Sequence, residues 1–203
     1  MNLAVFVSGR GSNLKAILEN EELSKKITVK VIFSDKIDCG AFTMASQYQI
    51  PKYSISAVEK NGYISFAQVK SILSEKKIDL IVLAGYLKLI PAEIISDFQN
   101  KIINIHPALL PLFGGKGMYG MNVHNACYDS GMKVSGATVH FVDNTFDTGK
   151  IIFQKCTDIS NVVGPEEIAK RVLHIEHEIL PFVIGKIAEQ KLKFEDDRII
   201  IQN

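Results

Sequence analysis

The chain has 203 residues, of which 47% are hydrophobic and 22% are charged. This composition is typical of one globular domain with a sizeable core and excludes a disordered chain. The 23 Lys and Arg residues nearly balance the 22 Asp and Glu residues, so the basic excess of a nucleic-acid-binding protein is missing. Any recognition of phosphate must therefore be local.

The cysteines and the first residues of the chain indicate the cellular compartment in which the protein works. The cysteines are odd in number, widely spaced and form no Cys-x-x-Cys pair: Cys39, Cys127 and Cys156. This pattern favours a reducing compartment. The first eight residues lack the basic segment and long apolar run of a signal peptide, and no apolar run reaches membrane-spanning length. We therefore expect a cytoplasmic protein that has neither nucleic acid nor a membrane as a partner.

The first half of the chain alternates short apolar runs with segments of helical periodicity. Strands are predicted over residues 3–7, 29–33, 78–84 and 102–105, with a short extended segment over 51–55 and helices between them. Such alternation predicts an α/β fold, a single Rossmann-like domain with a mostly parallel sheet and helices on both faces. Ligands of these sheets bind beyond the carboxyl ends of the strands. Functional side chains should therefore follow residues 7, 33, 84 and 105.

The second half contains a glycine-rich loop and longer elements. The loop spans residues 112–122, and a helix near 123–130 follows it. Two longer strands are predicted over 134–142 and 150–157, and a terminal hairpin over 192–201. The last helix should start at Gly164-Pro165, where Pro is favoured, and Pro181 should end or kink it. No repeat or linker interrupts the chain, which indicates one domain over 1–203.

The turn after the first strand reads Gly9-Arg10-Gly11-Ser12-Asn13. Backbone N–H groups of such a turn, with the following helix N-terminus, suit an anion. Alternatively, it is a tight turn in which Ser12 or Asn13 caps the helix. A dinucleotide site stays open because Asp35 follows the second strand, although Leu14 replaces the third glycine of that fingerprint.

Asn104-Ile-His106-Pro107 is the sharpest motif. Side chains two residues apart on a strand point to the same side, so an amide and an imidazole converge where the strand ends. Pro107 keeps His106 extended. This pair suits stabilisation of an oxyanion coupled to proton exchange. Alternatively, both side chains only form hydrogen bonds with backbone groups of a loop. Burial of two polar side chains without a function would, however, cost folding free energy.

Other polar residues point less clearly to a function. Asp147, in the Phe146-Asp147-Thr148-Gly149 turn, reads as a turn residue on its own. His140 reads as a hydrogen-bonded core histidine. His174 and His177 are three residues apart on the last helix, but no carboxylate–histidine spacing supports a metal site.

Several motifs together resemble the folate-dependent formyltransferases. They are the Asn104–Pro111 segment, Gly136–Val142, Asp147-Thr-Gly149, the Ser8–Leu14 turn and Leu83–Leu87. The resemblance spans nearly the whole chain. Within that family, the sequence is most similar to the purine-synthesis branch. The resemblance implies transfer of the formyl group of 10-formyltetrahydrofolate, as a co-substrate, to the amine of glycinamide ribonucleotide (5-phosphoribosylglycinamide), without a metal. The chain would act as a monomer or homodimer.

The resemblance also implies roles for individual residues. Asn104, His106 and Asp147 match the family's catalytic triad. The phosphorylated substrate is expected at Gly11, Ser12, Asn13 and Glu176. The folate is expected at Lys60, Leu87, Lys88, Leu89, Ile90 and Asn104. Residues 1–100 would then bind phosphate, and residues 101–203 would hold the folate and the catalytic groups.

The chain departs from the family's common pattern at two places. Residues 112–122 form a longer, more glycine-rich loop, and Lys88 replaces an Arg, which removes a planar contact. In the implied mechanism Asn104 and a protonated His106 stabilise the tetrahedral oxyanion. The carboxylate of Asp147 should raise the pKa of His106 above that of an isolated histidine.

Four other functions remain as alternatives. A formyltetrahydrofolate hydrolase would share the triad but use water, and such relatives usually carry an additional amino-terminal domain. A methionyl-tRNA formyltransferase would need a tRNA-binding extension and more positive charge. A dinucleotide oxidoreductase would depend on Gly9, Gly11 and Asp35. A non-enzymatic nucleotide-binding module would leave Asn104 and His106 unexplained.

Overall fold

The computed structural model describes residues 1–202. The chain forms two compact units, the first spanning Met1–Ile103 and the second beginning at Asn104. Seven strands form a sheet of order β3-β2-β1-β4-β5-β6-β7. Strand β5 (Ile102–His106) runs through the boundary, so its first residues belong to one unit and its last to the other.

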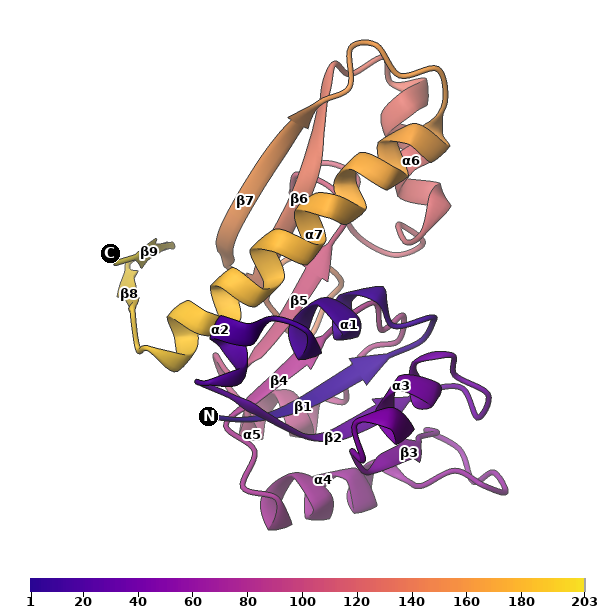
Figure 1. Cartoon of the computed structure of the whole chain (residues 1–203), viewed down its shortest axis with the longest axis vertical. Coiled ribbons are helices and arrows are strands. Elements are labelled where there is room, and N and C mark those ends of the chain that lie inside the picture. The colour runs from indigo at the N-terminus through magenta and orange to yellow at the C-terminus, as the bar shows by residue number, and fades with distance from the viewer. Residues whose placement is uncertain (203) are drawn as a thin grey trace. The chain divides into compact units, whose positions relative to one another are not determined.

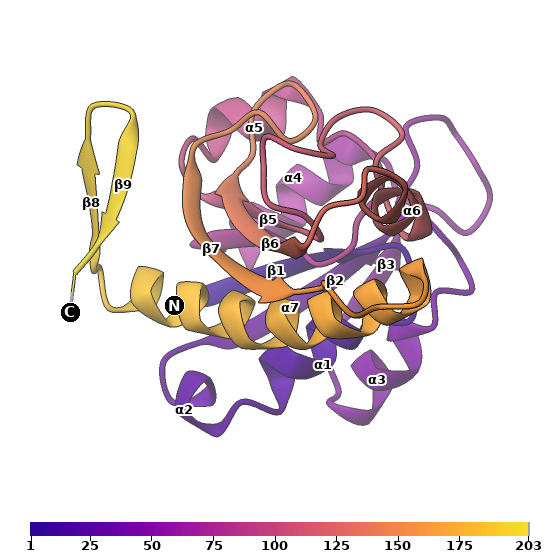
Figure 2. The ribbon, with the colours of Figure 1, turned by 90° about the horizontal axis from the view of Figure 1, so that it is seen from above.

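The first unit consists of parallel strands with helices between them. Its strands are β1 (Asn2–Val7), β2 (Thr28–Ser34), β3 (Lys52–Ser54) and β4 (Leu80–Leu83), and β1–β2, β1–β4 and β2–β3 all pair in parallel. Its helices are α1 (Ser12–Leu18), α2 (Glu21–Ser24), α3 (Ala41–Gln47), α4 (Phe66–Glu75) and α5 (Ala92–Asp97). Figure 2 shows α1 and α3 on one face of these strands and α4 on the other. The predicted mostly parallel sheet is confirmed, whereas the short helix α2 was not predicted.

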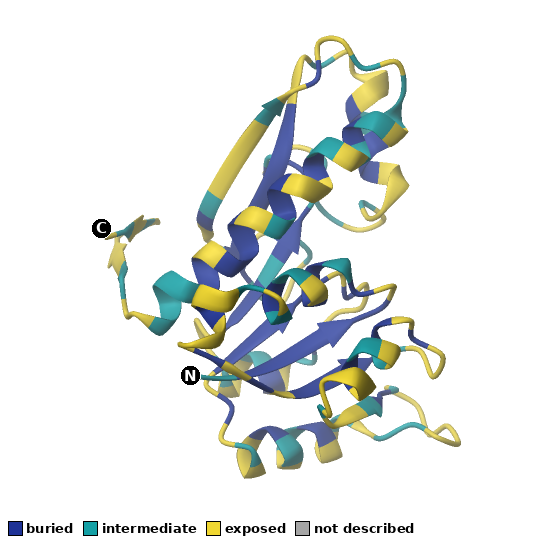
Figure 3. Ribbon diagram, in the orientation of Figure 1, coloured by how far each residue is buried: buried dark blue, intermediate teal, exposed yellow. Residues whose placement is uncertain are grey.

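The core of this unit lies along β1. Residues Leu3–Val7 are all fully buried, and the strands beside them are dark in Figure 3. A strand paired on both edges and covered on both faces has no solvent side, which is why its sequence is continuously apolar. The carboxyl ends of β1 and β4 consequently stay rigid supports for the loops that follow them.

The second unit is built around an antiparallel pair of long strands. They are β6 (Val134–Phe141) and β7 (Ile151–Asp158). Helix α7 (Pro165–Ala188) packs along both strands, and α6 (Met121–Asp129) packs against α7 (Figure 1). The predicted terminal hairpin is confirmed as β8 (Leu192–Glu195) and β9 (Arg198–Ile201). Its Phe194 ring stacks on Phe141 of β6 at 5.7 Å between centroids.

Pro181 was expected to end or kink the last helix, and the structure shows that it does not end it. Helix α7 begins at Pro165, as expected, and continues through Pro181 to Ala188. A proline inside a helix costs about 3 kcal/mol. The turns around it bury Ile179, Leu180, Val183 and Ile184, and each buried aliphatic side chain contributes about 1.5–3 kcal/mol. Apolar burial therefore outweighs the lost hydrogen bond. Within residues 1–202, no helix is both long and apolar enough to cross a membrane.

Candidate active site

The second unit brings together the three residues predicted to be catalytic. Asn104 and His106 alternate with the buried Ile103 and Ile105 along β5, so the two polar side chains leave the same side of the strand. The Nδ1 atom of His106 lies 3.5 Å from Oδ2 of Asp147, and His106 is only 3% exposed. An amide, an imidazole and a carboxylate thus share one nearly buried cluster.

The ring of His106 has a defined orientation. Its Nε2 lies 2.8 Å from the carbonyl oxygen of Phe113. A carbonyl only accepts hydrogen bonds, so Nε2 carries the hydrogen and donates. Nδ1 is therefore the nitrogen that faces Asp147 and can exchange a proton.

The expectation that the pKa of His106 lies above the usual histidine value is wrong. Burial lowers the pKa of His106 and outweighs the opposing effects of the Asp147 carboxylate and the Phe113 carbonyl. Asp147 does raise the pKa, as its charge requires, but the ring has lost most of its hydration. His106 therefore rests as a neutral imidazole near pH 7, with an unprotonated Nδ1.

The turn from Asp143 to Gly149 sets the position of Asp147. The Asp143 carboxylate accepts hydrogen bonds from the N–H of Thr145 and the hydroxyl of Thr148. Asp147 has φ 59, a left-handed conformation in which Asp is enriched among non-glycine residues. A Cβ on Gly149 would lie 1.8 Å from the carbonyl oxygen of Phe141, so only glycine fits there.

The glycine-rich loop contributes a hydrogen bond to Asp147. The N–H of Gly115 donates to Oδ2 of Asp147 at 2.9 Å. Burial opposes ionisation of Asp147, but its interactions with His140 and His106 and the Gly115 hydrogen bond together lower its pKa. The carboxylate is therefore charged at neutral pH.

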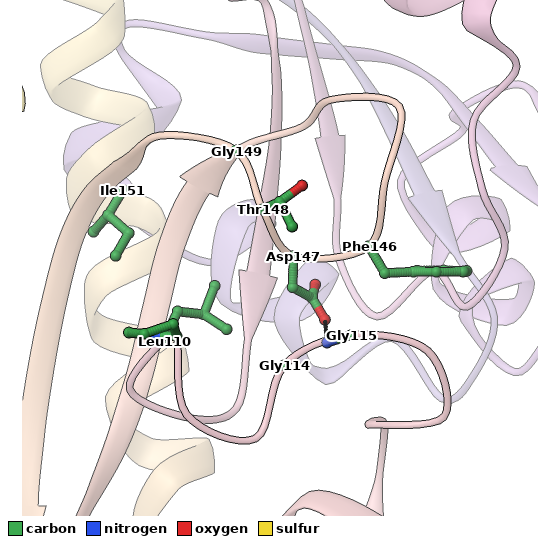
Figure 4. Close-up of a pocket in the computed structure, with 9 residues that line it drawn as sticks. Leu110, Gly114, Gly115, Phe146, Asp147, Thr148, Gly149 and Ile151 are labelled. Carbon is green, nitrogen blue, oxygen red and sulfur yellow. Dashed lines mark hydrogen bonds between the residues drawn. The ribbon is translucent and has the colours of Figure 1, made fainter. Parts of the chain in front are cut away.

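A cavity of ≈ 370 Å³ opens beside the Asp147 carboxylate. Figure 4 shows that carboxylate directed at the Gly114–Gly115 segment, with Leu110 and Ile151 to one side. Its lining is Leu110, Pro111, Gly114, Gly115, Phe146, Asp147, Thr148, Gly149 and Ile151. A small ligand in this cavity would meet an apolar wall and the partly exposed carboxylate of Asp147.

His140 belongs to this cluster, which the sequence reasoning missed. Its Nε2 lies 3.1 Å from Nδ2 of Asn104 and 3.6 Å from Oδ1 of Asp147. His140 is 2% exposed and its Nδ1 bonds to the Phe141 carbonyl at 2.8 Å, so it is a hydrogen-bonded core histidine as expected. The sequence signal for a further role was an ionisable side chain in a strand that is buried from Ser135 to Phe141.

In the first unit, the turn after β1 has the geometry of a tight β–α connection. Gly11, with φ 82, is the N-cap of α1, and no side chain caps the helix. A Cβ on Gly11 would lie 2.7 Å from Cβ of Ala41. The carbonyl of Gly9 accepts from Ala41 N–H and the Cys39 thiol. Ser12 and Asn13 thus stand in the first turn of α1 without a capping role for their side chains.

The segment after β4, predicted to contact the folate, is tied to this turn. The Oγ of Ser8 accepts a hydrogen bond from the Leu87 N–H at 3.0 Å, and Ser8 N–H donates to Gly85 O at 3.1 Å. Leu87 and Leu89 are exposed large apolar residues, while Ile90 is buried. Lys88 is exposed. The two predicted ligand segments of the first unit are therefore adjacent.

Lys60, Glu176 and Leu14 complete the set of residues that the sequence singled out. Lys60 is exposed, and its Nζ lies 4.3 Å from the centroid of the Tyr63 ring. Glu176 is buried on α7 at 8% exposure. Leu14 is fully buried in α1, where a dinucleotide site would need glycine.

The remaining ionisable groups include one tyrosine with a shifted pKa and no group of metal ligands among the described residues. Burial raises the pKa of Tyr86, and the nearby Asp35 carboxylate adds to the effect. Over residues 1–202, no three His, Cys, Asp or Glu side chains are grouped as ligands of a metal ion.

Comparison with known proteins shows which family the chain resembles. The formyl transferase family model matches residues 1–184. The chain is 43% identical over 205 residues to the chloroplastic phosphoribosylglycinamide formyltransferase of Arabidopsis thaliana, covering 99% of this chain and 70% of that protein. It is 35% identical to the phosphoribosylglycinamide formyltransferase of Bacillus subtilis, covering 91% of this chain and 93% of that protein.

A solved structure agrees with the sequence relatives. The phosphoribosylglycinamide formyltransferase of Anaplasma phagocytophilum superimposes with a TM-score of 0.89 at 30% identity, covering 100% of this chain and 95% of that one. The match spans the β1 turn, the β5 motif and the turn carrying Asp147. The chain belongs to the formyl transferase family.

Proposed function

We propose that this protein transfers the formyl group of 10-formyltetrahydrofolate to the amine of 5-phosphoribosylglycinamide. The products are formylglycinamide ribonucleotide and tetrahydrofolate, a step of purine biosynthesis. The observation that carries the proposal is the buried pairing of His106 with Asp147, beside Asn104. The names of the relatives reported above support the choice of substrates.

The first step forms a bond between the substrate amine and the formyl carbon. The formyl oxygen then becomes an oxyanion of a tetrahedral intermediate. Asn104 is the proposed donor to that oxygen, because an amide N–H fixed on a strand needs no reorganisation as charge develops. Bringing two bound molecules into line supplies the rest of the rate enhancement.

His106 is the proposed carrier of the proton. At rest its Nδ1 is unprotonated, so it can take the proton that the attacking amine must lose. The imidazolium is then stabilised by Asp147, 3.5 Å away, and by the Phe113 carbonyl at Nε2. The same proton passes to the departing folate nitrogen as its bond to carbon breaks. His106 thus ends neutral, and the step balances without another reactant.

The binding residues follow the family resemblance. Gly11, Ser12 and Asn13 are proposed to hold the phosphate through backbone N–H groups at the start of α1, and Glu176 is proposed to contact the sugar. Leu87, Lys88, Leu89 and Ile90 are proposed to cradle the pterin, with Lys60 as a further folate contact. Neither the folate nor the transfer requires a metal ion in this scheme.

We further infer that both units work together as one formyltransferase domain. The family match runs across the boundary between them, from residue 1 to residue 184. We propose the cytoplasm as the compartment, which suits the three free cysteines, although the plant relatives are named as chloroplastic. The protein is proposed to work as a monomer or homodimer.

The test is consumption of 10-formyltetrahydrofolate by the purified protein, followed by absorbance. The expected result is turnover with glycinamide ribonucleotide and none with water alone or with methionyl-tRNA. Turnover without an acceptor would indicate a hydrolase instead. Turnover only with the tRNA would indicate a different formyltransferase.

A further inference from the structure

Both ring nitrogens of His140 have a polar neighbour within hydrogen-bonding distance. It lies near the end of β6, immediately after a register shift between Val139 and His140 in the pairing with β7. Such bulges redirect a side chain and are common beside active sites. The redirected ring is 2% exposed and lies among Asn104, Phe141 and Asp147.

The hydrogen bonds of His140 define its tautomer. Its Nδ1 lies 2.8 Å from the Phe141 carbonyl oxygen, which can only accept, so Nδ1 carries a hydrogen. Its Nε2 lies 3.1 Å from Nδ2 of Asn104, and an amide nitrogen can only donate. Nε2 is therefore the acceptor, and the ring hydrogen that these contacts require lies on Nδ1.

This tautomer selects one of the two orientations of the Asn104 carboxamide. If the amide turned over, its Oδ1 would face the lone pair of Nε2, and two acceptors would oppose each other in a buried site. That orientation would leave both acceptors without a donor at this contact, whereas the observed one pairs a donor with an acceptor. Asp147 Oδ1 is also near Nε2, but at 3.6 Å it lies beyond the Asn104 contact.

We propose that His140 is a positioning residue of the transfer reaction, which acts by holding the amide of Asn104. With one N–H of Nδ2 bound to His140, the other N–H of the same atom keeps a fixed direction toward the oxyanion. Loss of the Nε2 acceptor frees the amide to rotate and to present Oδ1 instead. This inference rests on the proposed role of Asn104 in formyl transfer.

The matched variants are His140→Leu and His140→Gln. Both lose the Nδ1 hydrogen bond to Phe141, but only glutamine offers a carbonyl oxygen that can accept from Asn104. His140→Leu should lower kcat by about 10²-fold, the effect of losing one oxyanion donor, with little change in either KM. His140→Gln should recover at least about tenfold of that loss. Equal losses in both variants would overturn the proposal.

A double-mutant cycle with Asn104→Ala separates this role from a general structural one. If His140 acts through Asn104, His140→Leu should cost little in the Asn104→Ala background. Additive losses would contradict the proposal even where the formyl transfer itself is confirmed. Absence of transfer by the wild-type protein would instead contradict the proposed function.

A measurement independent of activity uses the ¹⁵N signals of the His140 ring in the free protein. The expected spectrum has a protonated Nδ1 and an unprotonated Nε2 near neutral pH, and it should persist in Asn104→Ala. A protonated Nε2 would reverse the hydrogen bond and overturn the inference, whatever the variants do to kcat.

Discussion

Ser8 joins the turn after β1 to the segment after β4, because its Oγ accepts a hydrogen bond from the N–H of Leu87 at 3.0 Å. The bond is sheltered, since Ser8 is only 2% exposed. The turn belongs to the proposed phosphate site and the segment to the proposed folate site. One buried hydroxyl therefore fixes the spacing of two binding segments within the first unit.

Ser8→Ala should weaken folate binding more than binding of the phosphorylated substrate. The substitution leaves the Leu87 N–H without its partner, at a cost of about 1–3 kcal/mol, while the backbone of the turn keeps its bond to Gly85. We expect the KM for the folate to rise about tenfold, with a smaller change for the ribonucleotide. Steady-state kinetics with Ser56→Ala as a control would check this. An equal rise in both KM values would mean that Ser8 supports only the fold.

Gly11 and Gly9 provide a matched pair for the phosphate turn. Gly11→Ala places a Cβ 2.7 Å from Ala41 at a positive φ, whereas a Cβ on Gly9 meets nothing within 4 Å. Gly11→Ala should therefore lower the free energy of unfolding by about 1–3 kcal/mol and raise the KM for the ribonucleotide. Gly9→Ala should unfold like the wild type in a denaturant titration. Similar stability of the two variants would contradict the strained geometry of the turn.

Asp147→Asn should impair turnover far more than binding. The substitution keeps the shape and the acceptor for Gly115 but removes the charge that stabilises the His106 imidazolium. We expect kcat to fall by about 10²-fold or more, with modest changes in KM. Since Asp147 opposes the effect of burial on His106, its loss should lower the pKa of His106 further. A near-normal kcat and an unmoved NMR titration of His106 would reduce Asp147 to a turn residue.

Buried neutral histidines should make the fold sensitive to mild acid. Burial lowers the pKa of His124, and the charge of His106 adds to the effect; burial also lowers the pKa of His106. Below pH 6.5, the ordinary pKa of histidine, the unfolded chain binds protons that the folded chain does not. The free energy of unfolding therefore decreases as the pH is lowered. Asp147, whose pKa lies below 3.8, gives stability that is lost only at still lower pH.

The variant that isolates this effect is His124→Asn, which removes one titrating group outside the proposed reaction. Between about pH 7.5 and pH 5.5 the Tm of the wild type should fall, and the fall should be smaller in the variant. Calorimetry at several pH values measures both. An equal or steeper fall in His124→Asn would show that His124 does not contribute to the acid sensitivity.

Local pattern predicted most of the fold because the central strands β1 and β4 are buried on both faces. Leu3–Val7 could be recognised for that reason, and the Gly164-Pro165 start of α7 follows from backbone chemistry. Pro181 was misjudged because its neighbours in α7 bury a large apolar surface, which a local rule does not count. The short helix α2 has too few residues to show a period.

The site was predictable where function depends on neighbours in sequence. Asn104 and His106 share a strand, so their convergence follows from the alternation of side chains. The part played by His140 depends on a bulge in β6 and on contacts with residues 36 and 7 positions away, which no local pattern reveals. The lowered pKa of His106 likewise depends on its burial in the folded protein, which no local pattern states.

The most direct test of the account follows the fate of the formyl carbon. The protein is mixed with 10-formyltetrahydrofolate labelled with ¹³C in the formyl group and with glycinamide ribonucleotide, and the products are identified by NMR. The label should appear as the formamide carbon of the ribonucleotide, in proportion to the tetrahydrofolate released, and His106→Ala should abolish most of this signal. Label recovered as free formate, with the ribonucleotide unchanged, would contradict the proposed transfer.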